Sequence, residues 1–549
     1  MFCGDDTGAL VMEVGCANAR FGFAGDDMPK AVFSSVRARR PPPPLPAPRR
    51  ASPRTPLPPA SSLSTLQLVG SVTEGPAATP SSAAVPQVPR KLFAGASARL
   101  PRAGMEVKSP LDFGIVDDFD ALEAVWGAGF SALRASPREH PLIVVEPSFS
   151  LTPQRERQAE LLFEGWGAPF LFMARAPLCQ AFSVGRASAL VLDIGASAAR
   201  ATPVVEGYVL QKGRLVSEVG GNAVCAALHE ALAASGQLGE QGLQPRAVAV
   251  RVGGGGGARG AGGGGGGGAS APAAGMDAEE GSKGGGGGGV GFAPLSTGRA
   301  AGWVRRPTAD LVSRSLYAAL SLEVLEDVKA CALHVAEIGY DPSRPPAETS
   351  YELPDGTPLR LGALREQIPE LHFRIEAAEG VKHLQAARQH AGWNALQHAE
   401  LLGPKRGNAP FPLHHLVQQA LLACQPSVRR DLCHHSACPR ARPPRTCTPT
   451  HPPTHPPTYP PIRTPPAVVL TGGGSLLSGL HKRLHWETLT LVPAAFKPRI
   501  LVASPLERQF SAWVGGSILG SLGTFQQLWV SKSEYDDLGP SAVVDRCFH

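Results

Sequence analysis

The sequence predicts an α/β protein made of two related lobes around a shared cleft, and three observations indicate this class. Apolar strands alternate with amphipathic helices, as in proteins with buried, mostly parallel sheets. The segment LVMEVGCANAR at 10–20 has a counterpart, LVLDIGASAAR, at 190–200. An acid, a glycine and an arginine stand at matching positions in the two segments: Glu13, Gly15 and Arg20, then Asp193, Gly195 and Arg200. Finally, low-complexity stretches separate the patterned parts without disturbing their order.

The length of the chain limits the number of its domains, and its charge bears on whether it binds nucleic acid. Its 549 residues suffice for two or three domains. The formal net charge is +6, but one proline-rich run without acids can supply the whole excess through its arginines at 37, 39, 40, 49, 50 and 54. We therefore expect a nearly neutral folded part, which weakens the case for direct nucleic-acid binding.

The cysteines and the apolar runs indicate the cellular compartment of the protein. Ten cysteines without regular spacing are typical of free thiols in a reducing environment. The chain does not open with a charged region followed by an apolar one, and no apolar run reaches membrane-spanning length. These features predict a cytosolic or nuclear protein with no membrane partner.

Three low-complexity segments divide the predicted lobes. They are a Pro/Arg-rich segment at 36–90, a Gly-rich segment at 253–291 and a Pro/His/Cys-rich segment at 433–466. Proline removes backbone donors and glycine favours flexible coil, so we expect no helix or central strand in them. Two origins stay open, genuine insertions or mis-spliced sequence. The first lobe then comprises 1–35 and 91–188, and the second comprises 189–252, 292–432 and 467–549, with the C-terminal helices returning to the first lobe.

The third segment also contains a tempting set of metal ligands. These are Cys433, His434, His435, Cys438, Cys447, His451 and His455. Structural zinc sites need ligands held tetrahedrally on short, ordered turns. The repeat THPPTHPPTYPP favours an unstructured or wrongly translated insert instead, so no metal site is predicted.

Local patterns predict the elements of the first half in order. LIVVE at 142–146 is a buried strand, and Thr152 caps a helix that runs to 164 with Pro153 at its first position. ALVLDIG at 189–195 is a strand, and 201–210 is a hairpin that turns at Glu206–Gly207.

The second half is predicted in the same way. Apolar spacing indicates a helix at 322–336. Residues 467–484 are a strand, a glycine turn and a helix, and the preceding helix ends near Leu432. The tail at 507–537 forms helices that are broken near Gly515–Gly516 and Ser531.

The repeated turn has a chemical use. Exposed backbone N–H groups beside glycine and alanine can cradle phosphate oxygens, and a nearby carboxylate can hold Mg²⁺ through water. Two such turns facing each other would clamp one phosphate chain, which explains the repeat. TGGGSLLSGL at 471–480 would let a base or ribose approach its glycines. The sequence therefore predicts a nucleotide site.

Several longer stretches resemble the actin superfamily, which shares its fold with Hsp70 and the sugar kinases. The tail WVGGSILGSLGTFQQLWVSKSEYDDLGPS at 513–541 resembles the carboxyl terminus of actins closely, and 351–362 and 24–33 are similar to actin too. Other stretches resemble the nuclear actin-related protein 4 class: 8–15, 100–120, 207–221 and 324–341.

The resemblance implies a function. Members of this class are subunits of nuclear chromatin-remodelling and histone-acetyltransferase complexes, where they pair with actin on a helix of the remodelling ATPase. It implies ATP with Mg²⁺ as cofactor, a mainly nuclear location with some protein in the cytoplasm, only indirect contact with nucleosomes or DNA, and no ordinary filaments. Because the cleft turns survive while the water-positioning residues do not, we expect ATP to be bound at low stoichiometry. The Pro/Arg-rich segment falls where actins have their small upper subdomain, so we expect that subdomain to be degraded.

Departures from actin fall on the positions that carry chemistry. Glu13, Cys16 and Arg20 replace an aspartate, a serine and a lysine of actins. Ala176 and Arg200 replace the glutamine and histidine that orient the attacking water, so the resemblance implies no catalytic residue and weak or absent ATPase activity. Ala196 and Ala330 replace acids, and Gln509 replaces a lysine. The predicted nucleotide-binding residues are Glu13, Gly15, Cys16, Arg20, Asp193, Gly195, Lys329, Gly472, Gly473 and Gly474.

Two other functions stay open beside the scaffold subunit. A cytoskeletal actin-like protein would polymerise with ATP, but the altered hydrolytic positions count against it. A small-molecule kinase of the same fold would need an aspartate as general base, and Asp193 is the only obvious one.

Overall fold

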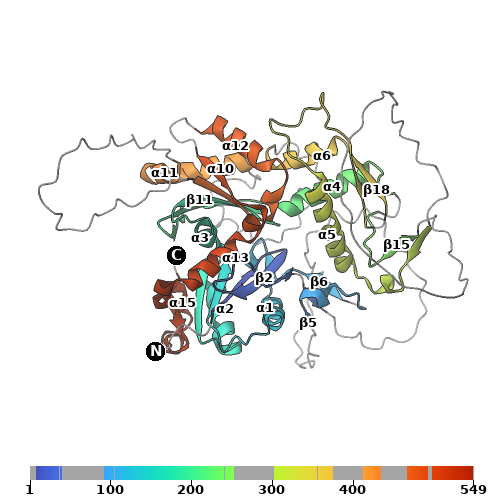
Figure 1. The fold of residues 1–549 in the computed structure, drawn as a ribbon. Coiled ribbons are helices and arrows are strands. Elements are labelled where there is room, and N and C mark those ends of the chain that lie inside the picture. The colour runs from blue at the N-terminus through green and yellow to red at the C-terminus, as the bar shows by residue number, and fades with distance from the viewer. Residues whose placement is uncertain are drawn as a thin grey trace, which may run out of the picture.

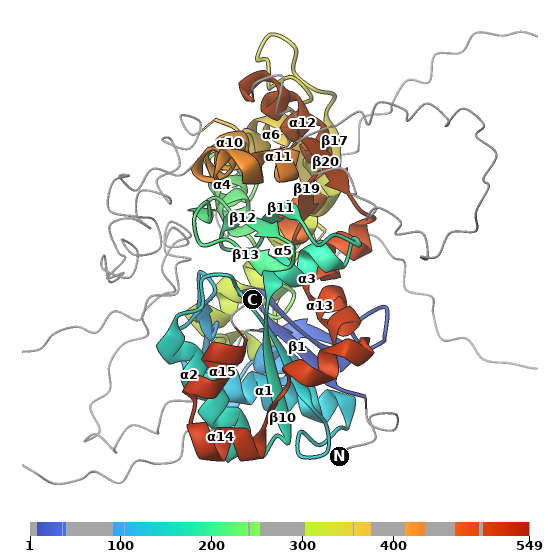
Figure 2. The same cartoon turned by 90° about the vertical axis from the view of Figure 1, so that its left-hand side faces the viewer.

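The computed structural model describes ten stretches of the chain: residues 8–35, 37–39, 92–103, 105–239, 242–252, 302–354, 356–374, 412–433, 467–492 and 498–547. It confirms the α/β class with two related lobes. Each lobe is built on one six-stranded sheet with its own buried apolar core. In the view of Figure 2, the two sheets lie one above the other.

The first sheet has the strand order β21-β10-β9-β1-β2-β3. β1 pairs antiparallel with β2 and parallel with β9, which in turn pairs parallel with β10. All five residues of β9 are buried, as its apolar sequence predicts. The strands are β1 (Leu10–Val14), β2 (Asn18–Phe23), β3 (Ala31–Ser34), β9 (Leu142–Glu146), β10 (Phe170–Arg175) and β21 (Val530–Ser531).

The second sheet repeats this order as β13-β12-β11-β19-β20, with β14 added on β12. β11 again pairs antiparallel with the next strand and parallel with a later one. The strands are β11 (Ala189–Ile194), β12 (Ala199–Val205), β13 (Tyr208–Val209), β14 (Leu215–Ser217), β19 (Ala467–Thr471) and β20 (Arg499–Val502). The predicted hairpin turn is confirmed, because Glu206 and Gly207 both have positive φ.

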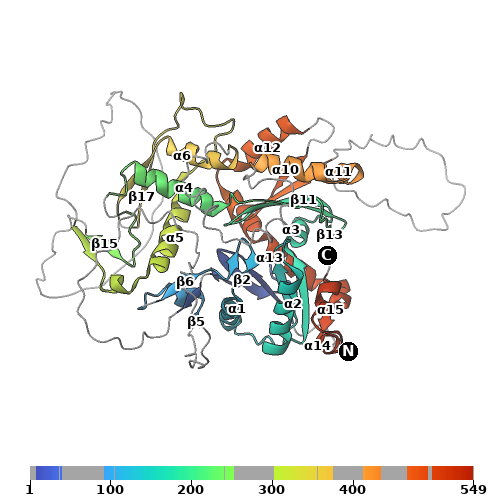
Figure 3. The ribbon, with the colours of Figure 1, turned by 180° about the vertical axis from the view of Figure 1, so that it is seen from behind.

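Helices cover both sheets (Figures 1 and 3). Those of the first lobe are α1 (Phe119–Leu133), α2 (Thr152–Glu160), α14 (Lys532–Leu538) and α15 (Ser541–Arg546). Those of the second lobe are α4 (Gly221–Ala234), α5 (Arg314–Ala332), α6 (Leu364–Gln367), α10 (Leu413–Ala423), α11 (Pro426–Cys433) and α12 (Leu480–Leu491). Among the described residues, none of the helices has both the length and the apolar character that crossing a membrane requires.

Two helices lie between the sheets, namely α3 (Ala176–Phe182) and α13 (Pro505–Ser521). The predicted break at Gly515–Gly516 is wrong, because α13 runs through both glycines. A Cβ on Gly515 would overlap the Cys179 carbonyl of α3, and a Cβ on Gly516 would lie 2.8 Å from Val145 Cγ2. These glycines therefore serve close packing between α13, α3 and the first sheet.

A small sheet of the first lobe reaches across to the second. It consists of β4 (Arg37–Arg39) between β5 (Leu92–Phe93) and β6 (Glu106–Lys108). The prediction that 36–90 contributes no central strand is wrong at its first residues, which contain no proline. We call its contact with α5 the latch: Ala98, Met105, Val107 and Leu316 form a buried cluster, and Val107 N donates to Ser315 Oγ at 2.9 Å.

Two predicted helix boundaries also need correction. Leu151 is the N-cap of α2, and Thr152 is its first residue, because the Leu151 carbonyl accepts from the amide of Arg155 at 3.0 Å. α5 begins earlier than predicted, at Arg314, and ends at Ala332. Beyond its end, Val335 N donates to Ser478 O at 2.8 Å, so a contact with another loop replaces the next helical turn.

The remaining paired strands are short. They are β7 (Leu111–Asp112) with β8 (Ile115–Val116), β15 (Ala249–Val252) with β16 (Gly302–Arg305), and β17 (Thr349–Glu352) with β18 (Pro358–Leu361). Apart from 37–39 and Cys433, the predicted segments 36–90, 253–291 and 433–466 lie outside the described residues. The six other residues of the Cys/His set in the third segment fall there too.

Candidate functional site: a cleft between the repeated turns

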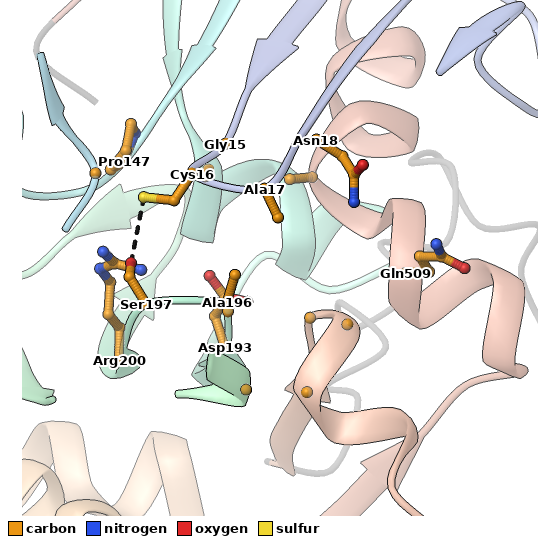
Figure 4. A pocket seen from close by; sticks show the side chains of 18 of the residues that line it. Gly15, Cys16, Ala17, Asn18, Pro147, Asp193, Ala196, Ser197, Arg200 and Gln509 are labelled. Carbon is orange, nitrogen blue, oxygen red and sulfur yellow. Dashed lines mark hydrogen bonds between the residues drawn. The ribbon is translucent and has the colours of Figure 1, made fainter. Parts of the chain in front are cut away.

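A cavity of about 300 Å³ lies between the two sheets. All ten residues predicted from the sequence line it, and so do Ala176, Ala196, Arg200, Ala330 and Gln509. Figure 4 shows side chains of both turns converging on this space. Its volume is in the range of small-molecule sites in proteins.

The two turns have the same backbone geometry. Glu13 pairs with Arg20 across β1 and β2, and Asp193 pairs with Arg200 across β11 and β12. Each turn is closed by the amide of its glycine: Gly15 N donates to Asn18 O at 3.0 Å and Gly195 N donates to Ala198 O at 2.9 Å. The repeat seen in the sequence is therefore a repeat in three dimensions.

Four amides at the tips of these turns have no acceptor among the described residues: those of Cys16, Ala17, Ala196 and Ser197. The tips also touch, since Ser197 Oγ donates to Cys16 Sγ at 3.2 Å (Figure 4). Burial raises the pKa of the Cys16 thiol, so it is the protonated sulfur that accepts this bond. Such a cluster of unpaired N–H groups can receive an anion from either lobe.

The first carboxylate is neutralised within its own hairpin. Arg20 Nη1 donates to Glu13 Oε1 at 2.5 Å, and the Arg20 guanidinium lies 5.5 Å from the centre of the Phe510 ring. Burial nevertheless raises the pKa of Glu13. Arg20 pairs with Oε1, while Oε2 has no hydrogen-bond partner among the described residues. Because the charge of Glu13 is already paired with Arg20, it is the weaker candidate for holding a cation.

The matching arginine of the second turn is used differently. Arg200 Nη2 donates to the carbonyl of Phe113 at 2.5 Å, in the loop between β7 and β8. Gly114 leaves room for it, because a Cβ there would lie 2.9 Å from Arg200 Nη2. The guanidinium thus ties the second turn to the first lobe.

Asp193 is the second carboxylate of the cleft. Burial raises the pKa of Asp193, against the attraction of Arg200 and a hydrogen bond from the Gln180 side chain. Gln180 was not among the residues predicted from the sequence. Its only sequence signal was its spacing, four residues after Ala176.

Lys329 and the glycine turn form another part of the lining. Lys329 Nζ donates to Gly221 O at 3.3 Å. Gly472 has φ 87° and, with Gly474, packs against β11, where a Cβ on either would clash with Asp193 or Ile194. Of the three glycines only Gly473 borders open space, so only there does the missing side chain leave the backbone open to a ligand.

His372 is a further lining residue that the sequence reasoning missed. It is 1 % exposed, and its Nδ1 has no hydrogen-bond partner among the described residues. Burial, together with the nearby Lys329 charge, lowers the pKa of His372 to about 4. The imidazole is therefore neutral at physiological pH. No sequence pattern marks this histidine.

The donor set fits a magnesium nucleotide. Four unpaired amides and Lys329 offer hydrogen bonds and positive charge to phosphates, and Asp193 offers oxygens to the water shell of Mg²⁺. Within the described stretches, no group of three or more His, Cys, Asp or Glu side chains could hold a metal alone. A cation here would thus be held mainly through its phosphates and waters.

Comparisons with known proteins agree with the two-lobed fold. The family model "Actin" matches residues 4–245, 299–435 and 466–548. The chain is 28 % identical to actin-related protein 4 of Arabidopsis thaliana over 553 residues, which covers 100 % of both chains. It is 26 % identical to actin-related protein 4 of Oryza sativa, again over 100 % of both, and 24 % identical to that of Schizosaccharomyces pombe over 98 % of this chain and 96 % of the relative. This chain therefore belongs to the actin family and, within it, to the actin-related protein 4 class.

Proposed function

We propose that this chain binds ATP with Mg²⁺ in its cleft without efficient hydrolysis and serves as a subunit of nuclear chromatin-remodelling and histone-acetyltransferase complexes. One observation carries the nucleotide part of the proposal. The repeated turns present four unpaired amides to a single cavity, beside Asp193 and Lys329. The subunit role is supported by resemblance to the nuclear actin-related protein 4 class.

The side chains at the hydrolytic positions support binding without turnover. Ala176 lines the cavity with a methyl group, which cannot orient a water. Arg200 donates to Phe113 O, and a guanidinium offers only donors, so it cannot serve as the base that accepts a proton from water. We expect neither residue to activate the attacking water.

Phosphate release tests this part directly. Full-length protein incubated with Mg²⁺ and ATP should release phosphate no faster than buffer, with a filament-forming actin as positive control. A rate similar to that of the control would contradict the proposal and favour a cytoskeletal, polymerising protein.

The partners in this proposal are actin, a helix of the remodelling ATPase and other chromatin-complex subunits. α13 offers exposed apolar side chains for a helix to cover: Ile518 is 37 % exposed, and Leu522, four residues later and just beyond the end of α13, is 45 % exposed. An apolar helix face can dock on such a surface.

Affinity purification tests the subunit role. The tagged full-length chain should recover actin, a remodelling ATPase and acetyltransferase subunits from nuclear extract. The double variant Ile518→Asp/Leu522→Asp should recover less of the ATPase while keeping its folded circular-dichroism spectrum. Recovery of filament-binding proteins from cytosolic extract would instead overturn the proposal.

A further inference from the structure

Gln180 is a buried polar residue at the point where the chain passes between the lobes. It belongs to α3, which connects β10 of the first sheet to β11 of the second. Its side chain is only 3 % exposed, yet it lines the cleft. Gln180 is thus buried from bulk solvent and borders the space that a ligand would occupy.

The two ends of the Gln180 amide are in different situations. The nitrogen donates to the Asp193 carboxylate, whereas Oε1 has no hydrogen-bond partner among the described residues. A buried acceptor left unsatisfied costs about 1–3 kcal/mol, so native proteins usually supply a donor. A ligand in the cleft could supply it.

The position of Gln180 on α3 explains why an amide is useful there. Ala176 and Gln180 are four residues apart, so they lie on the same face of the helix one turn apart, and both line the cavity. The resemblance to actins places a glutamine at 176, where this chain has a methyl group. Gln180 brings an amide back to the same helix face.

Glu13 is the other candidate for orienting a cation, but its charge is engaged. Its carboxylate is paired with Arg20 in its own hairpin. Asp193 also faces a cation, Arg200, but in addition it is held by the neutral Gln180 amide. Mg²⁺ keeps several of its waters when it binds to a protein. The oxygens of Asp193 and Gln180 can accept hydrogen bonds from those waters.

We propose that Gln180 is the positioning residue for the nucleotide-bound cation in this cleft. Its Nε2–H fixes the orientation of the Asp193 carboxylate, and its Oε1 accepts a hydrogen bond from a water bound to the cation. This inference rests on the proposed function, because it requires a magnesium nucleotide in the cleft.

The test measures ATP affinity of the full-length protein by equilibrium titration, once with Mg²⁺ and once with EDTA. The wild type should bind ATP more tightly with Mg²⁺. In Gln180→Leu, the ratio of the two affinities should fall by about tenfold, the effect of losing one hydrogen bond to a charged site. The affinity in EDTA should stay within about twofold of wild type.

Three further variants distinguish positioning from a purely structural role. Gln158→Leu is the matched control, since Gln158 is also buried at 5 % exposure but does not line the cavity. It should leave the affinity ratio unchanged. Adding Ala176→Gln to Gln180→Leu should restore the ratio. Gln180→Glu keeps the size of the side chain but replaces the Nε2–H donor by a carboxylate oxygen that faces Asp193. The ratio should therefore fall in this variant too, which keeps the test available if Gln180→Leu folds poorly.

The outcomes separate this inference from the function on which it rests. If the wild type binds no ATP in either buffer, the proposed function fails and this inference fails with it. If the wild type shows a magnesium-dependent affinity that Gln180→Leu and Gln180→Glu both keep unchanged, only the role of Gln180 is overturned. If Gln180→Leu loses the same factor of ATP affinity with Mg²⁺ as with EDTA, Gln180 has only a structural role.

Discussion

Glu13 and Arg20 form the ion pair that most directly shapes the first turn of the cleft. Their side chains are 15 % and 12 % exposed, so neither charge is well solvated. In Arg20→Leu, the carboxylate would stay buried without its partner. We expect the free energy of unfolding to fall by about 3 kcal/mol or more, measured by urea denaturation.

An exposed ion pair provides the control for this prediction. Arg157 and Glu160 are 53 % and 33 % exposed, and solvent screens their attraction. Arg157→Leu should therefore leave the denaturation midpoint nearly unchanged. Equal effects of the two substitutions would show that burial does not strengthen the Glu13–Arg20 pair.

His372 gives the fold a measurable dependence on pH. Its pKa is lowered from 6.5 to about 4, so between these values the unfolded chain binds a proton that the folded chain does not. The free energy of unfolding should therefore decrease as pH falls through this window. In His372→Leu this decrease should be shallower, as measured by denaturation at pH 7, 6 and 5. Parallel pH profiles of the two proteins would contradict the assignment.

The residues of the site differ in how far the sequence could reveal them. The acid, the glycine and the arginine of each turn were visible because a repeat within one chain supplies its own comparison. Gln180 and His372 were not, because they come from separate elements and only the fold brings them to the cavity. What surrounds a buried polar group depends on long-range packing, which one sequence does not display.

At the scale of elements, α13 depends on glycine for its close approach to α3. A Cβ at position 515 would overlap the Cys179 carbonyl, and that backbone atom cannot move aside as a flexible side chain would. Gly515→Ala should therefore lower the free energy of unfolding by about 3 kcal/mol or more, despite the better helix propensity of alanine.

Gly523, which lies two residues beyond the end of α13, is the control glycine. A Cβ there meets nothing within 4 Å, so Gly523→Ala should change the free energy of unfolding by less than about 0.5 kcal/mol. The comparison is made by urea denaturation of both variants. If both glycines tolerate alanine equally, α13 does not pack as closely as described.

The same glycines show where prediction of elements from sequence reaches its limit. A Gly–Gly pair ordinarily breaks a helix, and the interior of α13 contradicts that rule because tertiary contacts require the small residues. By contrast, β9, β11 and the Glu206–Gly207 turn followed from local patterns alone. The continuous apolar runs of the two strands and the glycine of the turn are visible within a few adjacent residues, so a single sequence suffices to predict them.

At the scale of the whole molecule, the latch joins the lobes on the side of the cleft away from α3 and α13. Leu316 of α5 is 1 % exposed in the cluster with Met105 and Val107, and Arg99 pairs with Glu323 at 2.7 Å. Figures 1 and 3 both show α5 beside β6. We expect a closed latch to restrict exchange of the nucleotide proposed for the cleft.

Opening the latch should therefore speed nucleotide release. Leu316→Asp places a charge in the apolar cluster, and we expect a fluorescent ATP analogue to dissociate about tenfold faster or more in stopped flow. Leu100→Asp is the control, because Leu100 is 56 % exposed on the same part of the first lobe. Equal dissociation rates for the wild type and Leu316→Asp would show that the latch does not control release.

The central claim is that the cleft holds ATP without hydrolysing it. The most direct measurement is the identity and amount of nucleotide released on denaturing freshly purified full-length protein, determined by chromatography. We expect ATP, with little ADP, at up to one per chain. Protein that carries no nucleotide and gains none when incubated with Mg²⁺ and ATP would contradict binding, and protein that carries mainly ADP would contradict the loss of hydrolysis.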